Sequence, residues 1–460
     1  MKSKVVTNSE EMDYVQEARD HLWMHARPWD EMSKPGGVKI FTQAEGTRIT
    51  DIDGNSYFDL MAGLWLVNVG HGRKEIADAV YEQMQKLCYV NTWSYATLPA
   101  IKLASKLADL APGSLGKVFF VNSGSEAVDA ASRMAKQYQF LSGFGKRYKI
   151  IARRNSYHGS TSGAQAITGG GWFRRKYFEP MVPGVRHVPH PYCYRCQYEL
   201  SYPNCDLLCA KAVEHEIQFE DPETVAAVIG ETIAGAPGVI PPPPDYWPKV
   251  RSICDKHGVL LIMDEVICGF GRTGKWFACE HYGVVPDIMT LAKGLSSGYL
   301  PIAAAIAKTE VADKFKGGVA ETFQHGITWG AHPVSCTAAL ANLAIMEREK
   351  LIARAAKIGK HLLNSLETLR SHPTVGDVRG RGLIAAVELV KDKKTKQSFE
   401  RDDPFNVRLS ERLIELGLLT RVRNIITISP PLIVTRKEID EVVGAIDQAL
   451  GDTEKEFSIS

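Results

Sequence analysis

The chain has 460 residues, of which 45% are hydrophobic and 23% charged, a composition typical of a globular protein with two or three domains. Its 55 basic and 53 acidic residues leave a net charge of +2, which excludes a general attraction for nucleic acid or an anionic membrane surface. No run of about 18 uninterrupted apolar residues occurs, so we expect no membrane span. The opening MKSKVVTNSEEMDYV lacks the apolar core of a secretion signal, which predicts a cytoplasmic location.

The first part of the chain predicts a helix followed by a small sheet. Residues 11–30 have the pattern of an amphipathic helix carrying Trp23 and Trp29, and we expect both indoles to be core residues. Residues 38–60 alternate between apolar and polar side chains and turn at residues 53–55, which is typical of short antiparallel strands.

From about residue 75 to 340, helical patterns alternate with apolar strands. The predicted strands are 117–122, 149–154, 226–231, 259–265, 288–292 and 302–307. Their runs are continuously apolar, which indicates a parallel sheet covered by helices on both faces. After about residue 345, helices enclose a shorter β section. The sequence therefore predicts an α/β protein whose large domain, residues 71–342, has a mostly parallel central sheet, with a small α+β domain formed by residues 1–70 and 343–460.

Ligands of such sheets bind at the carboxyl ends of the strands, and two of these ends lead into polar loops. The strand at 117–122 runs into Ser123-Gly124-Ser125-Glu126, where a helix begins. A helix N-terminus can bind an anion, although a Ser followed three residues later by Glu is also a common helix cap. The strand at 149–154 leads to Tyr157, which could stack on a planar ligand or be an ordinary loop residue.

Two further strand ends carry charged groups. The strand at 259–265 ends in Asp264 and Glu265, and a buried carboxylate needs a partner. We expect Glu265 to point the other way and pair structurally. Lys293 directly follows the strand at 288–292 and is flanked by small residues, although a snorkelling surface lysine is the alternative.

One ligand satisfies all four strand ends, namely pyridoxal 5′-phosphate (PLP). Its phosphate suits the helix that begins at 124, its ring suits Tyr157, its ring nitrogen suits Asp264, and its aldehyde suits Lys293. Asp264 would keep the ring nitrogen protonated, and Lys293, once displaced by a substrate amine, would act as the catalytic base.

A competing interpretation is the G-x-G-x-x-G pattern at 269–274, which by its letters alone is a dinucleotide loop. Such a loop should turn directly out of its strand with no charge at the strand tip. Here Asp264 and Glu265 precede it and would repel a pyrophosphate. We therefore rank a Rossmann-type dinucleotide-binding protein below the PLP interpretation.

The chain resembles the class III (omega) aminotransferases of PLP fold type I over nearly its whole length. The motifs that carry this resemblance are FFVNSGSEAV, YHGST, IMDEVICGFGRTGKWF, LAKGLSSGYLPI, HGITWGAHPVSC and ISPPLIVT. The resemblance implies a homodimer, or a tetramer, whose active sites lie at the subunit interface. It also implies cofactor contacts by Gly124, Ser125, Tyr157, Glu231, Asp264, Val266 and Lys293, and by Thr328 of the neighbouring subunit.

The implied reaction moves an amino group from an omega-amino acid or amine to a keto acid, expected to be pyruvate, in a ping-pong cycle through pyridoxamine phosphate. MAGLWLVNVG, YKIIARRNSYHG and YRCQYELSYPNC are most similar to taurine–pyruvate and omega-amine–pyruvate aminotransferases. The donor could be taurine, β-alanine, 4-aminobutyrate, a diamine or an arylalkyl amine. The alternatives within the fold are a decarboxylase or a racemase.

The resemblance also implies residues that contact the substrate. Trp65 and Trp93 match positions that line the substrate pocket of the family, and Tyr157 is expected to contact the substrate as well as the cofactor ring. The family's carboxylate-binding arginine aligns with Arg421, and Arg423 is the alternative in a loop that is shorter here. Where relatives often carry Gln or Met beside the cofactor, this chain has Ala234, which could enlarge the pocket.

Four of the nine cysteines fall within 17 residues, at Cys193, Cys196, Cys205 and Cys209. This spacing is near that of a structural zinc site, although the last gap is one residue longer than the strongest pattern. Two disulfides or four reduced thiols are the alternatives, and a reducing cytoplasm disfavours disulfides.

Overall fold

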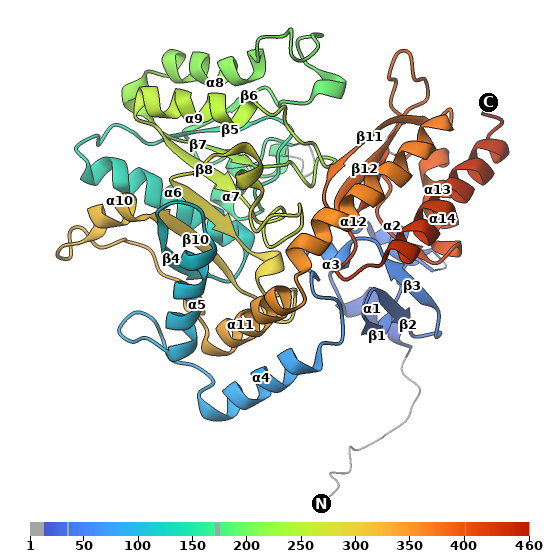
Figure 1. The fold of residues 1–460 in the computed structure, drawn as a ribbon, viewed down its shortest axis with the longest axis horizontal. Helices are drawn as coiled ribbons and strands as arrows, with labels where there is room; N and C mark the ends of the chain where they lie inside the picture. Colours follow the sequence, from blue (N-terminus) through green and yellow to red (C-terminus); the bar gives the residue numbers. More distant parts are fainter. Residues whose placement is uncertain (1–12, 35, 171–174, 401, 460) are drawn as a thin grey trace, which may run out of the picture.

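The computed structural model describes residues 13–34, 36–170, 175–400 and 402–459, and Figure 1 shows its architecture. A seven-stranded sheet forms the centre, in the order β4-β10-β9-β8-β7-β5-β6. Neighbouring strands are parallel except β10, which is antiparallel to both β4 and β9. The bounds are β4 Leu115–Val121, β5 Lys149–Arg153, β6 Val185–Val188, β7 Val225–Glu231, β8 Leu260–Asp264, β9 Ile288–Leu291 and β10 Ala303–Lys308.

The six strands predicted for this sheet are confirmed, and β6 is an edge strand that the sequence analysis missed because its run VRHV is short and half polar. β7, β8 and β9 are buried at every residue, as their continuous apolar runs require. Two apolar clusters cover the two faces of the sheet.

One face of the sheet packs against α6 and α7, and the other packs against α5, α8, α9 and α11. The bounds of the helices around this sheet are α4 Lys74–Lys86, α5 Leu98–Leu110, α6 Gly124–Leu141, α7 Ser162–Ile167, α8 Leu208–Phe219, α9 Tyr246–His257, α10 Thr309–Ala312 and α11 Pro333–Arg348. Among the described residues, every helix is too short or too polar to cross a lipid bilayer.

The two ends of the chain meet in a second β region, seen on the right of Figure 1. β1 (Phe41–Glu45), β2 (Arg48–Asp51) and β3 (Ser56–Asp59) form the antiparallel sheet predicted for residues 38–60. The short strand β13 (Leu418–Leu419) joins this sheet by pairing in parallel with β3. A chain segment near residue 420 is thereby fixed beside residues near 60.

A three-stranded sheet, β11-β12-β14, and the last helices complete this side of the molecule. Their bounds are β11 Val375–Arg381, β12 Ile384–Leu389, β14 Ile425–Ile428, α12 Leu351–Leu366, α13 Pro404–Glu415 and α14 Arg436–Glu456. The domain boundaries at residues 70 and 342 stay a prediction.

The single helix expected over residues 11–30 is wrong in part. The structure has two short helices, α1 (Tyr14–His21) and α2 (Trp29–Ser33), and residues 11 and 12 lie outside the described residues. Trp23 is 79% exposed and Trp29 50% exposed, so neither is a core residue of this chain. The two indoles pack edge to face with ring centroids 6.1 Å apart. An amphipathic pattern alone does not say what its apolar face will contact.

Candidate active site

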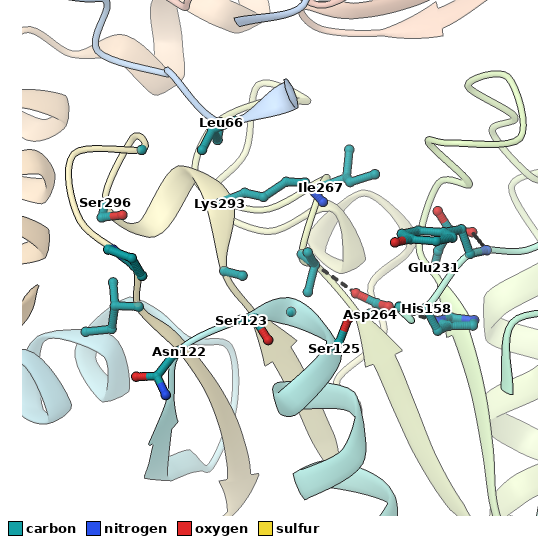
Figure 2. A pocket seen from close by; sticks show the side chains of 18 of the residues that line it. Leu66, Asn122, Ser123, Ser125, His158, Glu231, Asp264, Ile267, Lys293 and Ser296 are labelled. Atoms are coloured by element: carbon teal, nitrogen blue, oxygen red, sulfur yellow. Dashed lines mark hydrogen bonds and ion pairs between the residues drawn. The ribbon is translucent and has the colours of Figure 1, made fainter. Parts of the chain in front are cut away.

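A cavity of about 360 Å³ lies at the carboxyl edge of the central sheet. Figure 2 shows Lys293 and Asp264 reaching into it above the first turn of α6, which carries Ser123 and Ser125. The predicted residues that line the cavity are Gly124, Ser125, Tyr157, Glu231, Asp264, Val266 and Lys293. Strand ends far apart in the sequence thus converge as the parallel sheet predicts.

The start of α6 is both a capped helix and an open donor site. Ser123 Oγ accepts the Glu126 N–H, and Glu126 Oε2 accepts the Ser123 N–H, which is a complete capping box. The first helical hydrogen bond runs from Ala127 N–H to Ser123 O, so the N–H groups of Gly124 and Ser125 precede the helical ladder. Both residues line the cavity, at the end of the helix that attracts anions.

Close approach of two loops to this helix start requires glycine at two positions. A Cβ at Gly124 would lie 2.9 Å from Val266 Cγ1, and a Cβ at Gly159 would lie 2.4 Å from Ser125 Oγ. Gly159 also has φ of +134°, a conformation that other residues avoid. The missing side chains leave room for a ligand's anionic group to reach the backbone N–H groups.

Asp264 is a buried carboxylate with a full set of protein partners. Its Oδ2 lies 2.7 Å from His158 Nδ1, and its Oδ1 accepts from Thr290 Oγ1 and from the Val266 N–H at 3.0 Å each. These bonds fix the carboxylate at the tip of β8. The sequence pattern gave His158 no role of its own, although it directly follows Tyr157 in the loop after β5 and therefore carried the same signal.

Glu231 connects the loop after β5 to the loop after β7. Its Oε1 accepts the Tyr157 N–H at 3.0 Å, and its Oε2 accepts the Gly235 N–H at 2.9 Å. Burial raises the pKa of Glu231, and the nearby Asp264 carboxylate raises it further. Glu231 therefore holds the backbone that presents the Tyr157 ring.

Glu265 points away from the cavity, as expected. It accepts from Thr232 Oγ1 at 2.6 Å and from the N–H groups of Ala278 and Cys279 at 2.9 and 2.8 Å. Burial raises the pKa of Glu265 to about 7. Its role is structural, because it closes the loop that follows β8.

Lys293 begins the short 3₁₀ turn after β9 and has a φ of +46°, unusual for a residue with a side chain. Burial lowers the pKa of Lys293, although Asp264 and Glu231 act in the opposite direction. A lowered pKa increases the unprotonated fraction of an amine, and only the unprotonated amine can act as a nucleophile or base. The snorkelling surface alternative is wrong, because the side chain points into the cavity.

Of the predicted substrate residues, Tyr157 lines this cavity, whereas Trp65, Trp93 and Arg421 lie outside it in the single chain. Trp65 is only 4% exposed and packs beside the cavity, whereas Trp93 is 71% exposed and Thr328 is exposed on a loop. Ala234 is fully buried and does not line the cavity, so the suggestion that it enlarges the pocket is wrong. Its neighbour Ile233 lines the cavity instead. Other lining residues that the sequence analysis did not single out are Leu66, Ile267, Ser296, Gly298, Leu300 and Ile302.

Arg421, the first of the two arginine candidates, lies beside Trp65 and the loop that follows β7. Its guanidinium carbon is 5.1 Å from the centroid of the Trp65 ring, and Nη2 donates to Ala236 O at 3.3 Å. Burial, and then the adjacent Arg423, lower the pKa of Arg421 to about 10. Arg421 is half-buried, whereas Arg423 is exposed.

The loop at 269–274 is a structural link and not a phosphate loop. Arg272 is fully buried and donates to Leu383 O at 3.1 Å, to Pro430 O and to Asn68 Oδ1 at 2.6 Å. The loop leads to a 3₁₀ turn at Ala278–Tyr282 and not into an α-helix, so it lacks the helix N-terminus that a dinucleotide loop requires. Gly271 and Gly274 allow tight packing against the C-terminal part of the chain, because an added Cβ would lie 2.6 Å from Ile352 Cδ1 and 2.8 Å from Ala356 Cα.

The zinc interpretation of the four clustered cysteines is contradicted by the structure. Among the described residues, no group of three or more His, Cys, Asp or Glu side chains is arranged to hold a metal ion. All nine cysteines of the chain are free thiols, so the disulfide alternative is not realised either. Burial raises the pKa of Cys209 to about 11, with Cys193 and Cys205 adding to it, which disfavours thiolate chemistry at this cluster.

The groups in the cavity match the parts of PLP. Its phosphate suits the exposed N–H groups at the start of α6, where glycine leaves the approach open. Asp264, with its imidazole neighbour, is a fixed anion for a protonated ring nitrogen, and Lys293 offers an amine for the aldehyde. The residues present therefore fit this cofactor.

Comparisons with known proteins agree with the site. The model of the class III aminotransferase family matches residues 32–450. The chain is 39% identical to the putrescine–pyruvate aminotransferase of Pseudomonas aeruginosa, over 97% of this chain and 98% of the relative. It is also 39% identical to the taurine–pyruvate aminotransferase of Bilophila wadsworthia, over 91% and 94% of the two chains.

A solved structure has the same fold. The omega transaminase of Pseudomonas jessenii in complex with PMP aligns with a TM-score of 0.93 at 36% identity, covering 98% of this chain and 100% of that one. These similarities rule out the dinucleotide-binding interpretation, and they favour amino-group transfer over decarboxylation or racemisation. The chain thus belongs to the class III aminotransferases, PLP-dependent enzymes of fold type I, and is similar to omega-transaminases.

Proposed function

We propose that this aminotransferase moves an amino group from a terminal or non-α carbon of an amine to pyruvate. The observation that carries the proposal is the placement of Lys293 and Asp264 in one cavity at neighbouring strand ends. The candidate donors are taurine, β-alanine, 4-aminobutyrate, diamines such as putrescine, and arylalkyl amines. The names of the two relatives above support a diamine or taurine and a pyruvate acceptor.

Five residues would hold the cofactor. Gly124 and Ser125 would bind the phosphate, Tyr157 and Val266 would pack on the two faces of the ring, and Asp264 would bind the ring nitrogen. When bound, PLP supplies an aldehyde that condenses with amines and a protonated ring that withdraws electrons. Asp264 keeps its negative charge in place through bonds to His158 and Thr290, so it favours the protonated ring.

Lys293 would act as both anchor and base. Its amine would hold the aldehyde of the cofactor at rest and, once free, would move a proton at the substrate carbon. The lowered pKa of its amine suits this role, because a base must be unprotonated at the working pH. Glu231 assists by fixing the Tyr157 backbone.

The substrate would be held by residues at the edge of the cavity. Trp65 and Trp93 would provide aromatic walls, and Arg421 would bind the carboxylate of pyruvate as a bidentate pair. An amine without a carboxylate offers no anionic group to Arg421, so the guanidinium must then move out of the substrate-binding position. Its position over the Trp65 ring is a place where it can do so.

We also propose that the enzyme is a homodimer with shared active sites, and that a tetramer is two such dimers. Thr328 and Trp93 are exposed and lie outside their own chain's cavity, which suits a role at the neighbouring site. Large apolar side chains gather as exposed residues on the same part of the chain, namely Tyr81, Met84, Leu87, Trp93, Tyr95, Leu98, Ile101 and Trp329. A monomer seldom exposes so many. Nine free thiols suit a reducing compartment, and we place the enzyme in the cytoplasm.

The visible absorption of the purified holoenzyme tests the reaction. Taurine, putrescine or 1-phenylethylamine should bleach the band of lysine-bound PLP, and pyruvate should restore it with stoichiometric formation of alanine. If no amine bleaches a yellow protein, the donor assignment is wrong. If a bleached enzyme recovers with 2-oxoglutarate but not with pyruvate, the acceptor assignment is wrong.

A further inference from the structure

Glu231 and Asp264 are two buried carboxylates at neighbouring strand ends, and both line the cavity (Figure 2). They are direct partners in the register of the parallel strands β7 and β8, and they are only 3% and 5% exposed. Two carboxylates in one buried site resist ionisation together, so that one of them tends to keep a proton. The contacts of Glu231 nevertheless suit an anion. It accepts two N–H groups, from Tyr157 and Gly235, and a protonated carboxyl would need an acceptor for its own hydrogen.

Arg153, the last residue of β5, is a buried cation with no ion-pair partner among the described side chains. It is 2% exposed, and its Nη2 donates to the main-chain oxygen of Glu231. Its Nε and Nη1 are buried and meet no hydrogen-bond acceptor in the part of the chain that the structure describes. A guanidinium keeps its charge in proteins, and an uncompensated buried charge is costly. The charge of Arg153 must therefore be compensated by negative charge in the same buried region.

The backbone of β7 holds this guanidinium beside Glu231. A Cβ on Gly230, the residue before Glu231, would lie 2.9 Å from Arg153 Nε, so the close contact requires glycine. The Trp247 ring packs at the same place, with its centroid 5.1 Å from Arg153 Cζ. Burial raises the pKa of Glu231, whereas His158 and Arg153 act in the opposite direction. Arg153 thus favours the ionised form of Glu231 through its position next to the tip of the strand.

We infer that Arg153 is a positioning residue of the cofactor site, which supplies the counter-charge for Glu231. Because Arg153 balances Glu231, the charge of Asp264 is left for the protonated ring nitrogen of PLP. Without the guanidinium, the two carboxylates would share a proton. That proton would weaken both the contact of Asp264 with the ring and the contact of Glu231 with the Tyr157 backbone. The inference rests on the proposed contact between Asp264 and the ring nitrogen.

The dissociation constant of PLP from the apoenzyme, measured by absorption titration, tests the inference in a double-mutant cycle. Arg153→Met keeps an unbranched side chain but removes the charge, and it should weaken PLP binding about 10- to 100-fold, as loss of one charge interaction in a buried site implies. Glu231→Gln should also weaken binding, because it leaves Arg153 without its counter-charge. The double variant Arg153→Met/Glu231→Gln again has balanced charges, so it should bind PLP more tightly than Arg153→Met alone. Arg153→Lys, which keeps the charge, should retain most of the affinity.

Arg154→Met is the matched control, because it removes the adjacent but exposed arginine and should leave PLP binding unchanged. Unchanged affinity in Arg153→Met, or losses that simply multiply in the double variant, would overturn the inference, since a guanidinium that only packs cannot be rescued by removal of a carboxylate. If Arg153→Met does not fold, Arg153→Gln takes its place in the cycle, because its amide still offers a donor to the oxygen of Glu231. Wild-type PLP affinity in Asp264→Asn would instead overturn the proposed ring contact.

Discussion

Two groups of residues are proposed to form the active site of this protein. They are held in place by different parts of the fold. The strand-end group, Gly124, Ser125, Tyr157, Asp264 and Lys293, lines a single cavity at the edge of the central sheet. The junction group, Trp65, Trp93, Thr328 and Arg421, lines no part of that cavity in the single chain. A single chain thus brings together most of the residues proposed to hold the cofactor, whereas Thr328 and the proposed substrate residues other than Tyr157 depend on other contacts.

The difference follows from what holds each group. Each member of the strand-end group comes within a few residues of the carboxyl end of a strand of the central sheet, so the sheet fixes its place. Trp65 and Arg421 instead depend on the pairing of β3 with β13, and Trp93 and Thr328 lie on exposed loops. The residues that perform the chemistry shared by proteins of one fold can therefore be predicted from the strand ends. The residues that select the substrate are expected on loops and at subunit contacts, which strand patterns do not predict.

The largest effect is expected at Lys293, in the strand-end group. Lys293→Ala should lower the rate of alanine formation by at least roughly 10³-fold, since it removes both the nucleophile and a proton-transfer group, and the latter alone contributes about 10²–10⁴-fold. The band of lysine-bound PLP should disappear from the visible spectrum. Lys360→Ala on the exposed face of α12 is the control and should change neither quantity. A variant that kept its absorption band and its turnover would contradict the role of Lys293.

The next largest effect on catalysis is expected at Asp264, and its neighbour Glu265 provides the comparison. Asp264→Asn should lower kcat about 10²-fold, because the neutral amide no longer favours a protonated ring nitrogen. Glu265→Gln should leave kcat nearly unchanged. Each substitution disturbs a buried acceptor of three hydrogen bonds, so each should cost roughly 1–3 kcal/mol of unfolding free energy. Steady-state kinetics and urea unfolding on both variants check the pair. Equal kinetic losses would mean that both carboxylates serve the cofactor.

Substitutions in the junction group should affect the use of pyruvate more than the use of an amine that has no acidic group. Arg421→Ala should raise the KM for pyruvate about 10- to 100-fold, as expected for removal of a charged bidentate partner, and should leave the reaction of 1-phenylethylamine nearly unchanged. Arg423→Ala is the matched control on the same loop. If the two substrates suffer equally in Arg421→Ala, or if Arg423→Ala shows the selective loss, the carboxylate role passes to Arg423.

The smallest effect is expected outside both groups, at His372. Its Nδ1 lies 2.7 Å from Glu454 and its Nε2 3.0 Å from Asp447, both on α14. Burial opposes the charge, but these two carboxylates raise the pKa of His372 above its ordinary value of 6.5. Because the folded-state pKa is the higher one, the stabilisation is full below about pH 6.5 and is lost as pH rises through the folded value.

His372→Gln should therefore lower stability by roughly 1 kcal/mol at pH 6 and by less at pH 9, measured as a shift of the urea midpoint. Turnover should not change, since the residue is remote from the cavity. His25→Gln, at an exposed position, is the control. A loss of stability that grows with pH would mean that the histidine is buried in its neutral form.

The sequence by itself determined the central sheet and the chemistry at its edge. Short continuous apolar runs bounded by turn residues are typical of strands buried in a sheet, and a carboxylate or a lysine placed directly after such a strand is expected at the sheet's carboxyl edge. That reasoning placed Asp264 and Lys293 together without any knowledge of contacts between them. It also predicted that Glu265 faces away, because successive residues of a strand point to opposite sides.

The tertiary structure decided what local patterns leave open. In the folded chain, His158 lies within hydrogen-bond distance of Asp264, and Arg272 of the GFGRTG loop is buried and bonded to the C-terminal part of the chain. Among the described residues, the four clustered cysteines have no metal-binding geometry. The tertiary structure also exposed Trp23, which the periodicity had assigned to the core. Finally, it set Trp65 beneath Arg421 through a two-residue strand that joins the ends of the chain. Each of these outcomes depends on contacts between residues distant in sequence, and a single sequence carries no direct signal of such contacts.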